Sequence, residues 1–271
     1  MANGKGKIMR IITVTSQKGG SGKTTLAGHM AVAADLAGAG PVAIVDTDPQ
    51  GSLSDWWNAR EAESPAFVQT SLATLKEDLA ALKREGVKLV FVDTPPTITH
   101  ANQKIIGMSD LLVVPTRPSP HDLRAVGPTI DIIERAGKPM LFAINCATMR
   151  AKLTGEAAIA LSQHGTVAPT VVHNRQDFAA SMIDGRTVLE TNTKGRSAEE
   201  INGLWGYVNS RLARLPASSN FKSVHHARVH FGNKAAEQRI ADHQNTDHRL
   251  GERQSSDHRP SRVKEVHIAN Q

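Results

Sequence analysis

The sequence predicts an α/β protein with a mostly parallel, twisted sheet and helices on both faces. Short β-branched, apolar runs alternate with longer helical segments along residues 10–215. A glycine-rich loop separates the first apolar run from the first helical segment, and acidic residues follow two later runs. Because the carboxyl ends of parallel strands meet at one edge of the sheet, the loop and the acidic residues are expected to lie close together.

Each predicted strand is a short run dominated by apolar residues such as Val, Ile and Leu, which is typical of strands buried on both faces. These runs are residues 11–15, 41–45, 88–92, 111–115, 139–144 and 167–172. The segments between them are rich in helix formers or place apolar residues at three- and four-residue spacing. The helices expected there are residues 26–37, 52–61, 72–85, 121–135, 153–164 and 197–215.

Three local features refine this scheme. Residues 63–71 have no clear pattern and are expected to be irregular. The pair Gly127-Pro128 is expected to break or kink the helix at 121–135, because proline lacks the backbone N–H. Ser197, with Glu200 three residues later, fits a capping box at the start of the last helix.

The composition limits the class of protein. The chain has 271 residues and a formal net charge of +6, enough for one large α/β domain with additional segments. The single cysteine, Cys146, excludes a disulfide framework, suits a reducing cytosol and argues against an iron–sulfur protein. No apolar run approaches the length of a membrane span.

The glycine-rich loop at residues 17–25, QKGGSGKTT, has the features of a phosphate-binding loop. Its glycines let successive backbone N–H groups point at phosphate oxygens, and the following helix adds partial positive charge. Lys23 can reach the β- and γ-phosphates, and the Thr24 hydroxyl can ligate Mg²⁺. The general pattern places glycine where this chain has Gln17, and the chain carries an additional lysine, Lys18. A glycine-rich turn with incidental lysines is the alternative, and the order strand, loop, helix argues against it.

Two acidic motifs follow predicted strands. The first is DTDPQG at residues 46–51, and the second is Asp93 followed by Thr94-Pro95-Pro96. Four apolar residues ending in Asp are typical of a Walker B strand, whose carboxylate holds a metal ion through water. Turns rich in Asp, Pro and Gly are common after strands, so each motif taken alone has an ordinary structural explanation.

Together these motifs resemble the ParA/MinD family of P-loop NTPases. KGGSGKTT is similar to the family's deviant Walker A motif, DTDPQG to its second box, and residues 175–190 to its late R-x-x-F…G-x-x-V-x-E segment, with Ser181 in place of Ala. The resemblance covers about residues 10–215. It implies ATP and Mg²⁺ as cofactors and slow ATP hydrolysis by an ATP-dependent homodimer.

The resemblance also assigns residues to these tasks. Lys18 would reach across the dimer interface, Asp48 would position the attacking water, Asp46 would hold a Mg²⁺-bound water, and Asn145 would contact adenine. The implied catalytic residues are Lys18, Lys23 and Asp48, and the metal site is Thr24, Asp46 and Asp93. The implied ATP-binding residues are Lys18, Gly19, Gly20, Ser21, Gly22, Lys23, Thr24, Thr25 and Asn145. The implied surface for non-specific DNA is Arg175, Arg186, Lys194 and Arg196.

The chain is most similar to the short ParA-type partition ATPases, which implies plasmid or chromosome partitioning with a ParB-like adaptor, in the cytoplasm and at the nucleoid. A positioning ATPase for a protein cargo and a MinD-like membrane ATPase are the alternatives within the family. A small-acid ligase or synthetase and a non-catalytic scaffold are the alternatives outside it. We expect a flexible leader at residues 1–9, the ATPase domain at 10–215 and a disordered basic, His-rich tail at 216–271, without a membrane partner.

Overall fold

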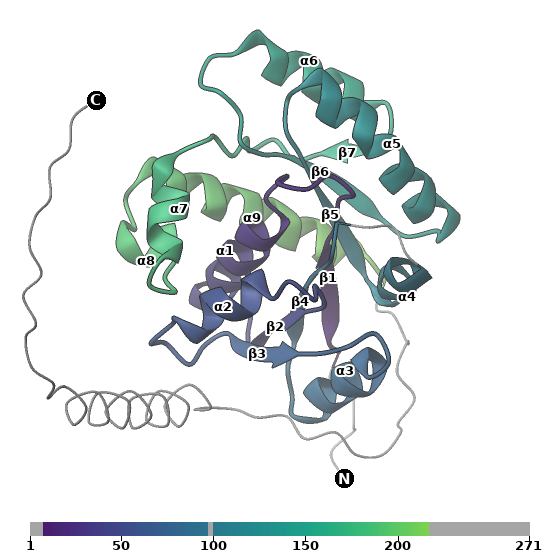
Figure 1. Ribbon diagram of the computed structural model, residues 1–271, viewed down its shortest axis with the longest axis vertical. Helices are drawn as coiled ribbons and strands as arrows, with labels where there is room; N and C mark the ends of the chain where they lie inside the picture. The colour runs from purple at the N-terminus through teal and green to yellow at the C-terminus, as the bar shows by residue number, and fades with distance from the viewer. Residues whose placement is uncertain (1–7, 97–99, 217–271) are drawn as a thin grey trace, which may run out of the picture. The chain divides into compact units, whose positions relative to one another are not determined.

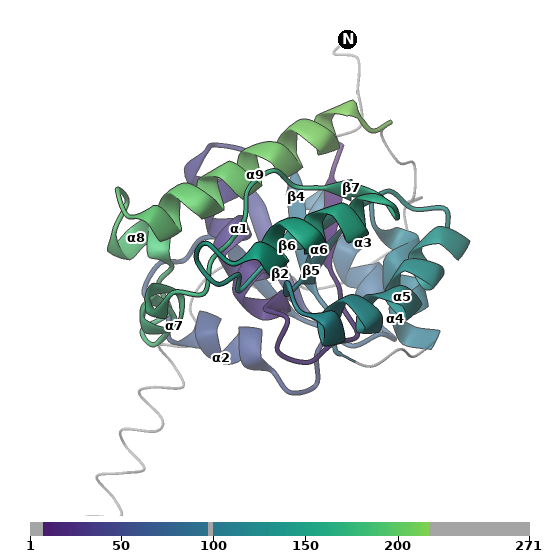
Figure 2. The ribbon, with the colours of Figure 1, turned by 90° about the horizontal axis from the view of Figure 1, so that it is seen from above.

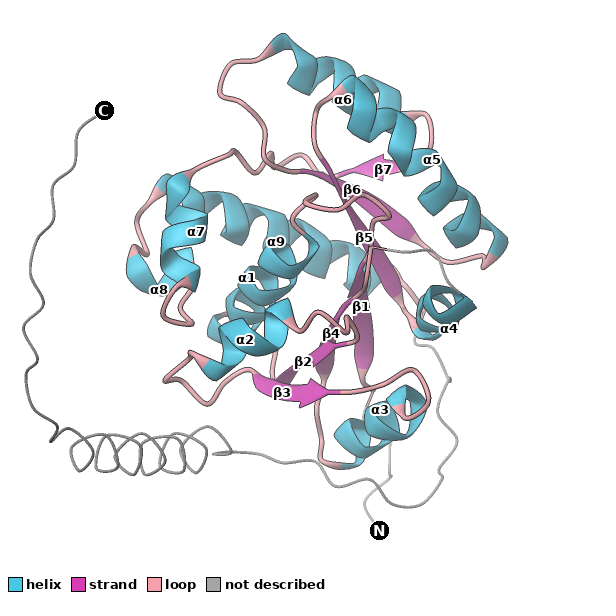
Figure 3. Cartoon of the chain, in the orientation of Figure 1, coloured by secondary structure: helices cyan, strands magenta, loops and turns pink. Residues whose placement is uncertain are grey.

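The computed structural model describes residues 8–96 and 100–216. Its centre is a seven-stranded sheet in the order β3-β2-β4-β1-β5-β6-β7, with every neighbouring pair parallel (Figure 3). The sheet is therefore parallel throughout, which confirms the predicted fold class. The strands are β1 (Arg10–Val14), β2 (Val42–Asp46), β3 (Ala66–Gln69), β4 (Leu89–Asp93), β5 (Leu111–Thr116), β6 (Met140–Ile144) and β7 (Thr166–Val167).

Helices cover both faces of the sheet (Figures 1 and 2). One face carries α1 (Lys23–Leu36), α2 (Ser52–Asn58), α7 (Gln176–Met182), α8 (Val188–Thr191) and α9 (Arg196–Arg214). The opposite face carries α3 (Leu75–Arg84), α4 (His100–Met108), α5 (Pro120–Arg135) and α6 (Lys152–Ser162).

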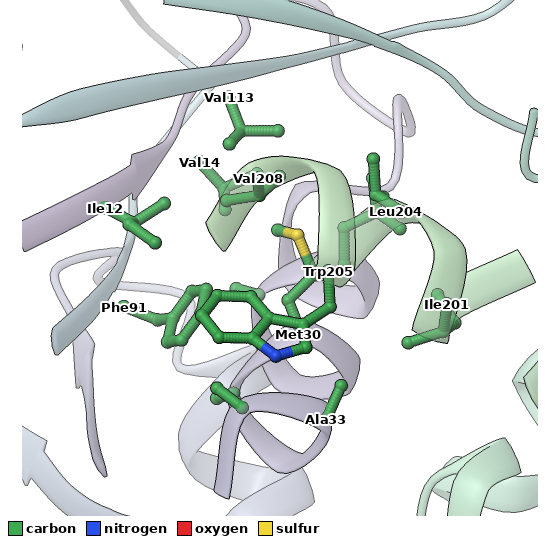
Figure 4. Packing of buried hydrophobic residues seen from close by; sticks show 14 of the residues in the cluster. Ile12, Val14, Met30, Ala33, Phe91, Val113, Ile201, Leu204, Trp205 and Val208 are labelled. Carbon is green, nitrogen blue, oxygen red and sulfur yellow. The ribbon is translucent and has the colours of Figure 1, made fainter. Parts of the chain in front are cut away.

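The core follows from the two-residue period of the strands. In β1, Ile12 faces the cluster formed with α1 and α9, while Ile11 faces the cluster formed with α3 and α4. Phe91 and Trp205 meet in the first cluster with ring centroids 5.9 Å apart, and Met30 of α1 lies beside them (Figure 4). Because α1 has α9 on one side and the sheet on the other, the helix after the glycine loop is held firmly.

Several local predictions were wrong. Residues 66–69 form β3, an edge strand beside β2, and the last strand is only Thr166–Val167 rather than 167–172. Helix α5 runs through Pro128, so the expected break does not occur, and a kink at this proline stays a prediction. Pro128 and Arg124, the residue whose carbonyl loses its helical partner, are both exposed, so water can satisfy that carbonyl.

The predicted capping box was also misplaced. Gly195 is the N-cap of α9, and the Ser197 hydroxyl instead donates to Asp177 Oδ2 at 2.8 Å. The capping box of this region is Thr187 with Glu190 at the start of α8, a helix that was not expected. The expected leader and tail lie almost wholly outside the described residues.

Candidate nucleotide-binding site

The glycine-rich loop connects β1 to α1 at the carboxyl edge of the sheet. Gly20 and Gly22 have φ angles of 71° and 90°, in the left-handed region that favours glycine. A Cβ at Gly22 would lie 2.1 Å from Asn145 Nδ2, so no larger residue fits there. Gly22 is also the N-cap of the 14-residue helix α1. The loop therefore joins left-handed glycines to a helix N-terminus, an arrangement that binds phosphate.

The two lysines of the loop differ in environment. Lys23 is 7% exposed, and its Nζ donates to the Lys18 carbonyl at 3.4 Å. Burial lowers the pKa of Lys23, while Asp93 and Asp48 act in the opposite direction. Lys18 is exposed, and its ammonium group makes no hydrogen bond or ion pair with the residues that the structure describes. Lys23 is thus fixed inside its own loop, whereas Lys18 is free to bind an anion outside it.

Thr24 and Asp93 meet below the loop. The Thr24 hydroxyl donates to Asp93 Oδ2 at 2.5 Å, and the Thr94 amide donates to Asp93 Oδ1 at 3.0 Å. Burial, with the Thr24 hydrogen bond acting against it and the neighbouring Asp46 adding to it, raises the pKa of Asp93 to about 7. Asp93 is a buried acidic group beside a hydroxyl, and a cation there would favour its charged form.

The acidic residues after β2 lie at the same edge, because Asp46 and Asp93 are paired in register on neighbouring strands. Asp46 is buried and anchors its loop: Oδ1 accepts from the Asp48 amide at 2.9 Å, and Oδ2 accepts from the amide and hydroxyl of Ser54. Asp48 is half-buried, and its Oδ1 accepts from the Gln50 amide at 3.0 Å. The carboxylate of Asp46 therefore also fixes the start of α2.

These residues fit a magnesium nucleotide. The Ser21 hydroxyl is buried and has no hydrogen-bond partner among the described residues, and a phosphate oxygen in the loop would supply one. The Thr24 hydroxyl and the carboxylates of Asp46 and Asp93 are the oxygen ligands that Mg²⁺ prefers, directly or through water. When bound, the magnesium ion would neutralise phosphate charge. The chain itself supplies the loop, the Lys23 ammonium and these oxygen atoms.

Asn145 lies directly after β6 and is 4% exposed. Its Nδ2 donates to the Ser21 carbonyl at 2.8 Å, and its own amide donates to the Thr116 carbonyl at 2.9 Å. Asn145 therefore braces the glycine-rich loop against β5 and β6. If the Asn145 side chain also contacts a nucleotide base, its carboxamide must keep the hydrogen bond to the Ser21 carbonyl while it does so.

The late segment at residues 185–190 is joined to α1 and α2 by a buried network. All five N–H groups of Arg60 are used: they donate to the Ser64 carbonyl, the Gly185 carbonyl and both carboxylate oxygens of Glu190. Burial alone would raise the pKa of Glu190, but Arg60 and Thr187 hold it below its ordinary value. On the other side, His29 Nε2 accepts from the Val188 amide at 3.2 Å.

The structure does not gather the four basic residues expected to bind DNA into one free group. Arg175 is half-buried and forms an ion pair with Glu200 at 2.5 Å, and Arg186 pairs with Asp184 at 2.6 Å. Lys194 and Arg196 flank the N-cap of α9, are exposed, and have no ion pair within the part of the chain that the structure describes. Of the four, these two carry a positive charge that is not already paired with a carboxylate among the described residues.

Sequence reasoning missed three residues of this site. Ser54 holds Asp46, Thr47 Oγ1 donates to the Asp93 carbonyl at 2.6 Å, and Arg117 lies beside Gly20. Arg117 directly follows β5, and a residue after a parallel strand lies at the carboxyl edge of the sheet, as Asp93 does. Its position was therefore predictable from the sequence. The partners of Ser54 and Thr47 depend on loop geometry that no spacing pattern indicates.

Comparison with known proteins gives the family. Residues 9–200 match the family described as VirC1 protein. The chain is 33% identical over 207 residues to the maintenance of carboxysome distribution protein A of Halothiobacillus neapolitanus, covering 73% of this chain and 95% of that protein. It is 32% identical over 130 residues to the protein ParA of Rhizobium radiobacter, covering 46% of this chain and 56% of that protein. The chain belongs to the VirC1/ParA family of ParA/MinD-type ATPases.

Solved structures of this fold agree with that assignment. The septum site-determining protein MinD of Pyrococcus horikoshii, complexed with Mg-ADP, superposes with a TM-score of 0.64 at 18% identity, covering 76% of this chain and 98% of MinD. A McdA variant from Cyanothece in complex with ATP gives a TM-score of 0.63 at 17% identity, covering 77% of this chain and 98% of McdA. At such identities the likeness shows the shared ParA/MinD fold. Within the described residues, none of the helices is long and apolar enough to cross a bilayer.

Proposed function

We propose that this member of the VirC1/ParA family is a Mg²⁺-dependent ATPase that distributes a protein cargo within the cell. The observation that carries the proposal is the similarity to a carboxysome distribution protein over 95% of that protein's length. The match to ParA covers 46% of this chain, so partitioning of a plasmid or chromosome, which the sequence alone favoured, becomes the second candidate.

In this proposal the described residues divide the work of ATP hydrolysis. Lys23 faces the phosphates, and Thr24 with Asp46 and Asp93 holds the magnesium ion. Asp48 orients the attacking water. The Gln50 amide donates to one of its carboxylate oxygens and fixes the group, and the other oxygen accepts no hydrogen bond within the described residues, so it can accept one from water. A single half-buried carboxylate is a weak activating group, so we expect slow intrinsic turnover.

The proposed dimer rests on the contrast between the two lysines. Lys23 is buried in its own loop, whereas the Lys18 ammonium is exposed and without a partner among the described residues. In an ATP-bound dimer, Lys18 would contact the phosphates of the partner's nucleotide. Dimerisation would also double the exposed pair Lys194 and Arg196, which makes non-specific DNA binding depend on ATP. A ParB-like adaptor would connect this dimer to the cargo and stimulate hydrolysis.

The test combines turnover with association. We expect the parent protein to hydrolyse ATP slowly with Mg²⁺ and to dimerise with a non-hydrolysable ATP analogue, as measured by light scattering. Asp48→Ala should dimerise with ATP without hydrolysing it, and Lys18→Ala should bind ATP as a monomer. Equal turnover by Asp48→Ala and the parent would refute the role of Asp48. Normal dimerisation of Lys18→Ala would refute the contact across the interface.

The nature of the cargo needs a test in the host. We expect deletion of the gene to leave the inheritance of plasmids and chromosomes unchanged and to make a protein assembly cluster or segregate unevenly. Asp48→Ala should reproduce the deletion, because it locks the ATP-bound state. Loss of a plasmid without selection, with all protein assemblies evenly placed, would instead support DNA partitioning.

A further inference from the structure

Arg117 lies next to the glycine-rich loop, and the proposed function gives this residue no role. It is the first residue after β5, and β5 lies beside β1, from which the loop departs. The Thr15 amide, just before the loop, donates to the Val113 carbonyl at 3.0 Å. The adjacent Thr116 carbonyl accepts the Asn145 amide at 2.9 Å. The backbone carrying Arg117 is therefore fixed by hydrogen bonds to the elements that hold the loop.

The guanidinium group of Arg117 lies against the loop. A Cβ built at Gly20 would be 3.5 Å from Arg117 Nη2 and 4.0 Å from its Cζ, which is van der Waals distance. Gly20 is exposed and in the left-handed region, so the surface of the loop here is bare backbone beside a cation. The following residues, Pro118 to Pro120, lead into α5, where Ser119 is the N-cap and accepts from the Asp122 amide.

The positive charge of Arg117 has no partner among residues 8–96 and 100–216, which the structure describes. The side chain is exposed, and its guanidinium group makes no hydrogen bond, ion pair or ring contact with the residues that the structure describes. Two other arginines, by contrast, are held in ion pairs: Arg60 with Glu190 and Arg175 with Glu200. A planar group with five donors, held beside a phosphate-binding loop, matches the geometry of phosphate oxygens.

We propose that Arg117 binds the phosphates of the nucleotide held in the loop of its own protomer, as a third cation beside Lys23 and the partner's lysine. This inference rests on the proposed function, because it needs a nucleotide in the loop. The contact is assigned to the same protomer because the guanidinium group lies beside its own Gly20, 3.5 Å from where a Cβ of that residue would be. Its fork would hold two phosphate oxygens, whereas the Lys23 ammonium acts as a point charge.

The test compares nucleotides that differ only in the number of phosphates. Dissociation constants for ATP, ADP and AMP are measured with Mg²⁺ by calorimetry, at concentrations where the protein is monomeric. We expect R117Q to weaken ATP binding about ten- to hundredfold and AMP binding far less, because charged hydrogen bonds to the outer phosphates are lost. R117K should recover only part of the loss. The matched control is R124Q, an exposed arginine on α5, which should change none of the three constants.

Each outcome decides between the inference and the proposed function. Equal ATP affinity of R117Q and the parent would overturn the inference and leave the proposed function intact. An equal loss for AMP and ATP would mean that the loop is distorted, which also overturns it. If R117Q binds ATP normally but no longer dimerises with the non-hydrolysable analogue in light scattering, the inference is overturned, and the guanidinium group belongs to the partner's nucleotide instead. A parent protein that binds no ATP would remove the proposed function and this inference together.

Discussion

Stability should depend on pH through His29, the buried histidine of the helix that follows the glycine-rich loop. The ring is fully buried, with Nδ1 2.8 Å from the Thr25 carbonyl and Nε2 accepting from the Val188 amide at 3.2 Å. This pair of contacts requires the neutral ring with its proton on Nδ1. Burial lowers the pKa of His29 to about 4, and the nearby Arg60 charge acts in the same direction.

The sign and size follow from linkage. Between pH 4 and 6.5 the unfolded chain binds a proton at His29 and the folded chain does not, so the free energy of unfolding rises with pH in that window. The contribution is fully present above pH 6.5 and is lost as pH falls towards 4. The pKa of His29 is about 4 in the folded chain and 6.5 in the unfolded chain. At about 1.4 kcal/mol per pKa unit, this difference contributes about 3 kcal/mol to the free energy of unfolding at neutral pH. About 2 kcal/mol of that contribution is lost when the pH falls to 5.

The assay is urea unfolding of the parent and of His29→Gln from pH 4.5 to 8. Glutamine can still accept from the Val188 amide but has no proton to gain in this range. We expect the parent to be the more stable protein at pH 8 and its advantage to shrink by about 2 kcal/mol at pH 5. His164, which is exposed, provides the control as His164→Gln and should leave the pH dependence unchanged. A constant difference between parent and His29→Gln across this range would refute the reasoning.

Two further outcomes concern packing, each measured by urea unfolding. Gly38 and Gly185 have similar φ angles of 73° and 77°, but a Cβ at Gly38 would meet nothing within 4 Å, while one at Gly185 would lie 2.3 Å from the Arg60 nitrogen. Gly38→Ala should therefore cost about 1–2 kcal/mol and Gly185→Ala clearly more, and equal losses would contradict the close approach. Trp205→Ala should cost about 3–5 kcal/mol by opening a cavity against Phe91, and a loss no larger than that of exposed Asn209→Ala would show that the site collapses.

Much of the fold could be predicted because its main signals are local. Strands of a parallel sheet are apolar on both faces, and the residue after each strand lies at one edge. This rule predicts that the loop, Asp46 and Asp93 lie at the same edge of the sheet, and the structure places them there. The edge strand β3 was missed because its apolar run, Ala66 to Val68, is shorter than the others, and three of its four residues are only half-buried.

The remaining errors come from contacts between distant residues. Ser197 has the spacing of a capping box, but Asp177 competes for its hydroxyl, and Glu200 is used by the His173 amide and Arg175. Arg175 seemed a surface cation by sequence, and its partner lies 25 residues further along the chain. Such pairings depend on how α7 and α9 meet, which neither propensity nor periodicity specifies.

The late segment at residues 185–190 has a physical explanation that its resemblance to a family pattern did not provide. Gly185 is left-handed and lies against the Arg60 backbone, Glu190 holds the Arg60 side chain, and the Val188 amide reaches His29. The segment thus joins α1, which follows the glycine-rich loop, to the end of α2, which follows the DTDPQG box.

The same segment holds Arg186, one of the residues expected to contact DNA, in local interactions. Its carbonyl accepts from Trp56 Nε1 at 3.1 Å, and its guanidinium group is paired with Asp184 in the same turn. The backbone of this turn is committed to the nucleotide-binding side of the fold. In the proposed function, non-specific DNA binding therefore draws first on cations outside this turn. Lys194 and Arg196 lie outside it, exposed on either side of Gly195, the N-cap of α9, and remain the predicted contacts.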